Sequence, residues 1–326
     1  MKQRFFIMAA AALTLAACSN DENMEMTDGP VEARITAGLS APTTRAIGTN
    51  WNADRIGVWV KDAPASDMEN LYKNVLYTTT STSATAEFTA TTGQGIFFQD
   101  ANETVTFAAY APYQESDDNA TLPGVNKDGL VKVNTETNNT EPLQEDIDFL
   151  FAEGATATRT NYTVTFADNT ASGGDDYSFH HKMAQLNVMF QTSITDGFGP
   201  DDIFGGSFNL GGLVHDGTFN VTDGTTETTG SEVADWDISG CKYEDAETTR
   251  TYSLILLPQD LTNKALNVKV GINGQTYYNS NAINPNLQAG YTYTYTITVK
   301  KSGLVVSGCT ITNWNTGSTG SGDAEM

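Results

Sequence analysis

The chain has 326 residues, of which 39% are hydrophobic and only 17% are charged, so it can build a large core and is not expected to be disordered. Its 40 acidic residues outnumber 17 basic ones, for a formal net charge of −23. This balance argues against nucleic acid as a partner and against docking on anionic lipid, because both need clustered Lys and Arg side chains.

The N-terminal segment reads as an export signal. Lys2 and Arg4 precede an apolar run over residues 5–17, which is too short to span a membrane in the mature protein. The run ends in Leu15-Ala16-Ala17-Cys18, which resembles the lipobox of bacterial lipoproteins. We therefore expect a diacylglycerol on Cys18 and acyl chains that anchor the protein. The alternative is ordinary secretion in which Cys18 has no role.

A tether over residues 19–30 leads into a segment with one apolar face. The apolar residues that alternate there are Val31, Ala33, Ile35, Ala37 and Leu39. This period of two predicts a strand. Pro42 cannot continue a ladder, so Arg45 should lie in a turn that a protease can reach.

This first strand has two interpretations. It is either an ordinary strand followed by a loop, or a removable strand that is released by a cut between Arg45 and Ala46. Removal would leave an apolar groove with unpaired backbone edges, and such an edge can pair with a strand of another chain.

The body of the chain reads as strands and turns. Strand patterns cover residues 55–60, 104–110, 161–166, 185–190, 252–257, 266–272, 275–278 and 291–299. Asn273 and Gly274 form a two-residue hairpin signal. Helix signals are limited to one short turn near residues 66–69, so the sequence predicts an all-β fold of sandwich type.

No residue set predicts catalysis, a cofactor or a metal. His180 and His181 are adjacent, so in a strand they point to opposite faces, and the common metal, phosphate and nucleophile motifs are absent. Aside from Cys18, the cysteines are Cys241 and Cys309. They could pair in an oxidising compartment or remain free thiols.

Several segments resemble, in order, those of the fimbrillin-like family of type V pilins. They are Arg55-Ile56-Gly57-Val58-Trp59, the strand from Val105 to Pro112, Asp148-Phe149-Leu150-Phe151-Ala152, the signature from Ser178 to Leu186, Leu256-Leu257-Pro258-Gln259, Ala289-Gly290-Tyr291-Thr292-Tyr293, and Thr310-Ile311-Thr312-Asn313-Trp314.

The resemblance implies two transthyretin-like β-sandwich domains in tandem. It divides the chain into a lipoprotein signal peptide (1–17), a tether with a removable strand (18–45), an N-terminal domain (46–172) and a C-terminal domain (173–326). The C-terminal domain would carry the donor strand, with Leu304, Val306 and Ile311 as candidate residues.

The resemblance also implies a route of assembly. The subunit would reach the outer membrane as a surface-exposed lipoprotein, an arginine-specific protease would cut at Arg45, and subunits would join into a fimbria by strand exchange. The alternative is a monomeric surface lipoprotein or tip adhesin that binds a glycan or a host protein.

Overall fold

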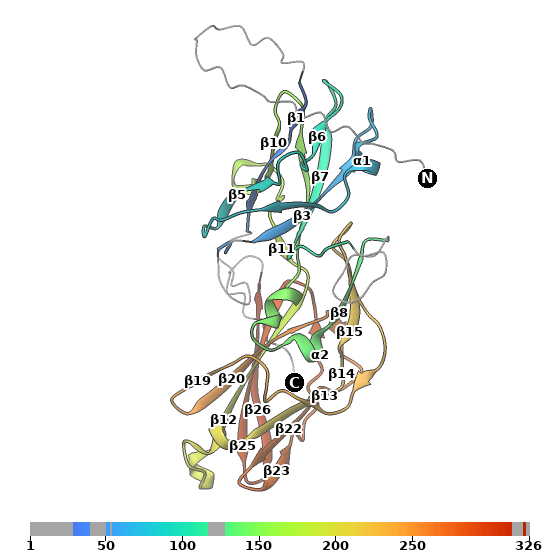
Figure 1. The fold of residues 1–326 in the computed structure, drawn as a ribbon. Coiled ribbons are helices and arrows are strands. Elements are labelled where there is room, and N and C mark those ends of the chain that lie inside the picture. The colour runs from blue at the N-terminus through green and yellow to red at the C-terminus, as the bar shows by residue number, and fades with distance from the viewer. Residues whose placement is uncertain (1–28, 40–49, 53, 117–127, 315–321, 324–326) are drawn as a thin grey trace, which may run out of the picture. The chain divides into compact units, whose positions relative to one another are not determined.

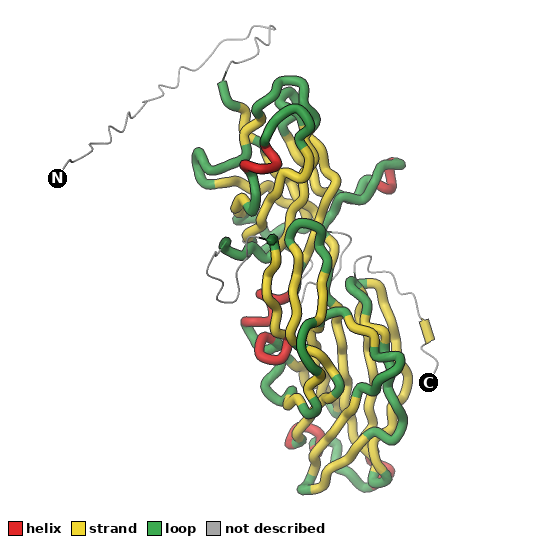
Figure 2. Tube along the Cα trace, turned by 90° about the vertical axis from the view of Figure 1, so that its right-hand side faces the viewer, coloured by secondary structure: helices red, strands yellow, loops and turns green. Residues whose placement is uncertain are grey.

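The computed structural model describes residues 29–39, 50–52, 54–116, 128–314 and 322–323. The chain forms two compact units, Met1–Pro30 and Val31–Met326, and only Gly29 and Pro30 of the first unit are described. The second unit is built from strands, and the prediction of an all-β fold is confirmed (Figures 1 and 2). Its helical elements in the described residues are short: α1 (Met68–Leu71), α2 (Thr135–Asn138), η1 (Leu143–Ile147), η2 (Thr170–Ser172), η3 (Ile194–Asp196) and η4 (Asp202–Gly205).

An eight-stranded sheet surrounds the first core. Its strands, in spatial order, are β10 (Thr163–Phe166), β2 (Arg34–Gly38), β5 (Thr85–Ala90), β4 (Val75–Thr78), β3 (Arg55–Asp62), β7 (Val105–Ala111), β9 (Leu150–Ala157) and β11 (His180–His181). The alternation of apolar and polar residues in β5 buries Ala86 and Phe88 and exposes Glu87, as expected for a strand with one wet face. The core gathers large rings, including Trp51, Phe107, Phe166 and Phe179.

Two further sheets enclose the second core. The six-stranded sheet orders β19 (Tyr243–Ala246), β20 (Thr249–Leu256), β12 (Ala184–Thr192), β25 (Tyr291–Lys300), β26 (Gly303–Asn313) and β27 (Gly322–Asp323). The four-stranded sheet orders β18 (Trp236–Asp237), β13 (Ser207–Gly211), β22 (Asn267–Ile272) and β23 (Gln275–Tyr278). Between β22 and β23, Ile272 pairs with Gln275, and Asn273 and Gly274 both have positive φ. The predicted hairpin is therefore confirmed.

Smaller strand groups complete the unit. They are β16 (Thr226–Thr228) with β15 (Asp216–Asn220) and β8 (Leu130–Asn134), β14 (Leu213–Val214) with β17 (Glu232–Val233), β21 (Gln259–Asp260) with β24 (Asn286–Leu287), and β1 (Val31–Glu32) with β6 (Phe97–Phe98). Because β8 pairs with β15, the ladder joins residues on both sides of the predicted boundary at 172/173. The exact boundary stays a prediction.

A third cluster packs side chains from both halves of the chain. Tyr110 and Phe149 lie here with Phe219, Leu257 and Trp314. The rings of Phe149 and Phe219 stack at 4.4 Å. The two larger cores are thus joined by buried apolar side chains as well as by the chain itself.

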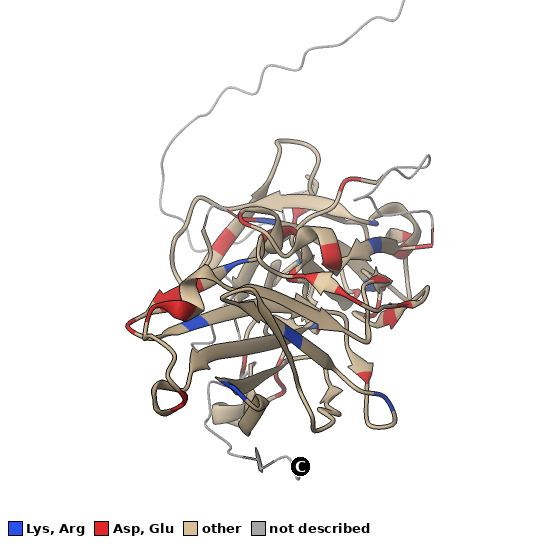
Figure 3. Ribbon diagram, turned by 90° about the horizontal axis from the view of Figure 1, so that it is seen from below, with Lys and Arg blue, Asp and Glu red and all other residues tan. Residues whose placement is uncertain are grey.

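Charge is spread thinly over the surface. Asp and Glu positions lie on several sides of the view in Figure 3, with fewer Lys and Arg positions between them. Among the described residues, no helix is long and apolar enough to cross a membrane.

Candidate functional site

The first strand lies inside a sheet, not at its edge. β2 pairs in parallel with β10, where Ile35 is opposite Val164, and antiparallel with β5, where Ile35 is opposite Phe88. Just before it, β1 pairs Val31 with Phe98. An inserted strand of this kind satisfies backbone groups on two neighbours at once, so its absence would expose two unpaired edges.

The apolar face of this segment is part of the first core. Ala33, Ile35 and Ala37 are only 2%, 1% and 0% exposed, and Val31 and Leu39 pack against the same cluster as half-buried residues. These are the five residues whose alternation predicts the strand. Since three of them are fully buried, the segment fills a hydrophobic cleft.

Aromatic rings form the floor of that cleft. Trp51 contacts Phe88 and Phe179 edge-on, with ring centroids 5.0 and 5.2 Å apart. The indole Nε1 of Trp51 donates a hydrogen bond of 2.9 Å to the carbonyl of Ala37. Trp51 therefore contacts the backbone of the first strand directly. Nothing in the sequence around Trp51 predicts this contact.

Additional backbone hydrogen bonds hold both ends of the segment. The amide of Ala33 donates to the carbonyl of Ile96 at 2.8 Å, and the amide of Arg34 donates to that of Tyr162 at 2.9 Å. At the other end, the amide of Leu39 donates to the carbonyl of Ala84, and the carbonyl of Gly38 accepts from Phe179. The strand is bound along its whole length.

The connection between this strand and the rest of the chain is short. β2 ends at Gly38, Leu39 forms an isolated bridge with Phe179, and Trp51 is already buried in the first core. Residues 40–49 join them, and they include the predicted cleavage site at Arg45 and Ala46, which lies outside the described residues. Any cut in this connection would separate residues 31–39 covalently from everything that follows. Cys18 also lies outside the described residues.

The candidate donor residues lie on β26. This strand pairs antiparallel with β25 over most of its length. Leu304 is 2% exposed, and Val306 and Ile311 pack half-buried against the second core. A bulge after Val306 shifts the register and lets Ile311 face the same side as Val306 despite their odd spacing.

The two cysteines are free thiols in the structure. Cys241 is buried and Cys309 is half-buried. Burial raises the pKa of Cys241 to about 12 and also raises that of Cys309. Both groups are therefore neutral and poorly nucleophilic at physiological pH.

The histidines occupy packed positions. His181 is 3% exposed, its Nδ1 lies 2.7 Å from an oxygen of Asp148, and its ring stacks on Trp314 at 3.8 Å. His215 is buried against Thr135 and Trp236, and burial lowers its pKa to about 4. Across the described ranges, no three His, Cys, Asp or Glu side chains are grouped to bind a metal.

The fold and this site define an all-β sandwich protein that is completed by its own N-terminal strand. The sequence profile of the fimbrillin-like family matches residues 44–314, and the chain belongs to that family. The resemblance seen in the sequence is thereby confirmed. The chain is also 31% identical over 344 residues, covering 99% of each protein, to a proposed fimbrium subunit, Fim1C, of Bacteroides uniformis.

Solved structures with the same fold come from Bacteroides species. A proposed cell adhesion protein of Bacteroides ovatus is 26% identical, with a TM-score of 0.67 over 88% of this chain and 98% of that one. A second, from Bacteroides uniformis, is 24% identical, with a TM-score of 0.63 over 89% of this chain and 100% of that one.

Proposed function

We propose that this protein is a structural subunit of a surface fimbria that is exported as a lipoprotein on Cys18 and assembled by strand exchange after cleavage at Arg45. One observation carries the proposal: the apolar side chains of residues 31–39 pack into the first core, β2 is paired on both sides, and residues 40–49 are the segment that joins it to everything that follows. Membership of the fimbrillin-like family supports it.

The energetics suit a strand that is held firmly until it is cut. Full burial of Ile35 contributes about 1.5–3 kcal/mol, and each alanine methyl adds roughly 0.8 kcal/mol. Each backbone hydrogen bond adds about 1 kcal/mol. While the connection is intact, the strand belongs to the same molecule, so its packing into the cleft costs no translational entropy. After a cut, the same contacts must hold a separate peptide, which costs at least several kcal/mol of association entropy.

The vacated cleft would then accept a strand from a neighbouring subunit. The candidate donor is β26, whose Leu304, Val306 and Ile311 present apolar side chains to one side. Donation requires β26 to leave β25 and to expose Leu304, so it is favourable only if the neighbour's cleft buries these groups again. The partners are therefore other fimbrial subunits, the outer membrane through the lipid, and an arginine-specific protease.

The test is controlled cleavage of the purified precursor. A trypsin-like, arginine-specific protease should convert it to a chain that starts at Ala46 and forms ladders on a denaturing gel run without heating. Arg45→Ala should stay monomeric under the same treatment. Arg159→Ala, which removes an arginine from a surface loop of the same domain, should behave like the parent. Ladders from Arg45→Ala would exclude the mechanism.

The alternative is a monomeric surface lipoprotein or tip adhesin. It predicts that the cut chain remains monomeric while the uncut chain binds a glycan or a host protein. Mass spectrometry of the native N-terminus separates the two cases, because the mature subunit would begin at Ala46 and the monomeric lipoprotein at a modified Cys18.

A further inference from the structure

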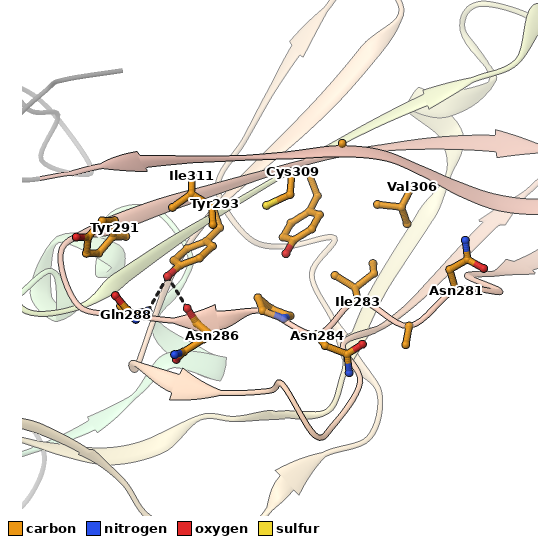
Figure 4. A pocket seen from close by; sticks show the side chains of 14 residues that line it. Asn281, Ile283, Asn284, Asn286, Gln288, Tyr291, Tyr293, Val306, Cys309 and Ile311 are labelled. Atoms are coloured by element: carbon orange, nitrogen blue, oxygen red, sulfur yellow. Dashed lines mark hydrogen bonds between the residues drawn. The ribbon is translucent and has the colours of Figure 1, made fainter. Parts of the chain in front are cut away.

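A hollow of about 350 Å³ opens beneath β25 and β26 in the second sandwich. One wall is a row of tyrosines on β25, namely Tyr291, Tyr293 and Tyr295, and the opposite wall is the segment 281–288. Figure 4 shows Tyr293, Cys309 and Ile311 on one side of this space, with Asn286 and Gln288 on the other. Its volume falls within the range of about 300–1,000 Å³ that is usual for small-molecule sites.

The local backbone explains why the space is open. Segment 281–288 crosses beneath the inner face of β25 and β26 mostly outside the ladders, apart from β24 and an isolated bridge at Ile283. The bulge in β26 includes Gly308, which has φ of +80° and no neighbouring atom within 4 Å of the position where a Cβ would stand. Bulges of this kind are common next to functional sites, where they redirect side chains. Here the bulge turns Cys309 and Ile311 toward the hollow.

The rim of the hollow is held in place by a buried tyrosine. The Tyr293 hydroxyl accepts a hydrogen bond of 2.9 Å from the amide of Gln288 and donates one to the carbonyl of Asn286. Tyr293 itself is 3% exposed. Because these hydrogen bonds fix the backbone at 286–288, they also fix the points from which the exposed side chains of Asn286 and Gln288 extend at the opening of the hollow.

The lining contains no charged side chain. Fourteen residues line the hollow, and at the overall charged fraction of 17% about two of them would be Asp, Glu, Lys or Arg. Burial, followed by a hydrogen bond with Cys309, raises the pKa of Tyr295, and burial raises that of Cys309. Both groups remain protonated at physiological pH. A charged ligand would find no ion-pair partner here.

The polar side chains that line the hollow are tyrosines and four carboxamides, of which Asn284 is already bound to the carbonyls of Leu261 and Lys264. Asn281, Asn286 and Gln288 line it, and their side chains make no hydrogen bond with any described residue. Carboxamides offer both donors and acceptors, while the aromatic wall, with the half-buried Tyr291 at one end, offers an apolar surface with polar hydroxyls. Aromatic faces with carboxamide edges and no charge match a pyranose ring, which has apolar C–H faces and hydroxyl groups around its edge.

We propose that this hollow binds a neutral saccharide, with the sugar face against the half-buried Tyr291 and its hydroxyls at Asn281, Asn286 and Gln288. A peptide strand is the competing occupant, since β27 pairs with β26 only at Thr310 and Ile311. The lining favours the sugar, because an inserted strand pairs through backbone groups and would gain little from three exposed carboxamides. The hollow is separate from the first-strand cleft, but it shares Val306 and Ile311 with the candidate donor strand β26, so it is tested in the uncut precursor, in which β26 is still paired with β25.

The test uses the two thiols as reporters on the uncut precursor. Because the raised pKa values make both thiols slow to react, N-ethylmaleimide labelling of Cys309 and Cys241 is carried out at about pH 8.5, where the thiolate fraction is larger than at neutral pH, and is followed by mass spectrometry over hours. A panel of neutral oligosaccharides of galactose, mannose or N-acetylglucosamine is added, together with their sialylated counterparts. A neutral sugar at ten times its Kd should slow labelling of Cys309 about tenfold, because only the unbound fraction reacts. Cys241, which lines no part of the hollow, should be unaffected.

Matched tyrosine variants complete the design. Tyr291→Ala should abolish protection and Tyr291→Phe should retain it. Tyr278→Ala, which removes an exposed tyrosine from β23, should behave like the parent. The proposal is overturned if no neutral sugar protects Cys309, if sialylated sugars protect it equally well, or if a synthetic peptide of residues 31–39 protects it when the sugars do not.

Discussion

Trp51 is the residue that links the first strand to the remainder of its core. Its indole donates to the carbonyl of Ala37, and its ring packs edge-on against Phe88 and Phe179. Because it follows the predicted cleavage site, it would stay with the mature subunit in the proposed assembly, while its hydrogen-bond partner would leave. The effect of changing it should therefore depend on whether the first strand is present.

For Trp51→Phe we expect the free energy of unfolding of the precursor to fall by about 1–3 kcal/mol, from one lost hydrogen bond and an incompletely filled core. Urea denaturation measures it. In a chain that starts at Ala46 the hydrogen-bond part of the loss should vanish, because Ala37 is absent. An equal loss in both chains would show that the contact to Ala37 contributes nothing.

The buried His215 should make the stability of the second core sensitive to acid. Burial lowers its pKa from the ordinary 6.5 to about 4, so the folded state holds a neutral ring where the unfolded state takes up a proton. As the pH falls from about 6.5 to about 4, the unfolded state binds the extra proton and stability is lost. The difference in pKa corresponds to about 3 kcal/mol at most.

His215→Gln should remove this part of the pH dependence while the carboxylates keep theirs. The measurement is the free energy of unfolding between pH 7 and pH 4 for both proteins. The stability of the parent should decline more steeply, so the gap between the two curves should narrow or reverse toward pH 4. Parallel curves would mean that His215 titrates normally in the folded state.

At the scale of elements, β2 shows what alternation can predict. The pattern at residues 31–39 located the strand and its buried face, and Asn273-Gly274 located a hairpin, because both signals are local. The neighbours of β2 could not be predicted: its parallel partner β10 lies more than a hundred residues away. Pairings of that separation are decided by the packing of the whole sheet.

Irregular elements could not be predicted from the sequence either. The odd spacing of Val306 and Ile311 breaks a simple period of two, and only the bulge at β26 explains it. The hollow beside that bulge depends on where segment 281–288 passes, which no local pattern encodes. The stack of Trp314 on His181 likewise joins two segments that lie far apart in the chain.

The strength with which the first strand is bound in its cleft should depend on the side chains that it buries. For Ile35→Ala we expect a loss of about 2–4 kcal/mol of core stabilisation, since Ile35 is 1% exposed. After cleavage, native mass spectrometry should find the leader peptide released at least tenfold more readily than from the parent. Thr36→Ala, a change on the opposite face of β2, is the matched control and should release it at the parental rate.

At the scale of the whole molecule, charge opposes assembly. Cleavage after Arg45 removes four basic and five acidic residues, so nearly all of the net charge of −23 stays on the mature subunit. Acidic positions occur on several sides of the described part (Figure 3). Subunits that approach one another should therefore repel, and in the proposed assembly the apolar side chains that a donor strand buries in the cleft would drive association.

The rate of assembly should consequently rise with salt. Between 0.01 and 0.15 M salt the Debye length shrinks from about 30 to about 8 Å, which screens repulsion between subunits but leaves buried apolar contacts intact. The subunits are cut beforehand at one fixed salt concentration, and the protease is then removed, so that salt acts on association and not on cleavage. Light scattering then follows polymer growth. We expect a several-fold faster rise at the higher salt. A rate that falls instead would mean that complementary charged patches steer the encounter, and the burial of a donor strand would then act only after electrostatic docking.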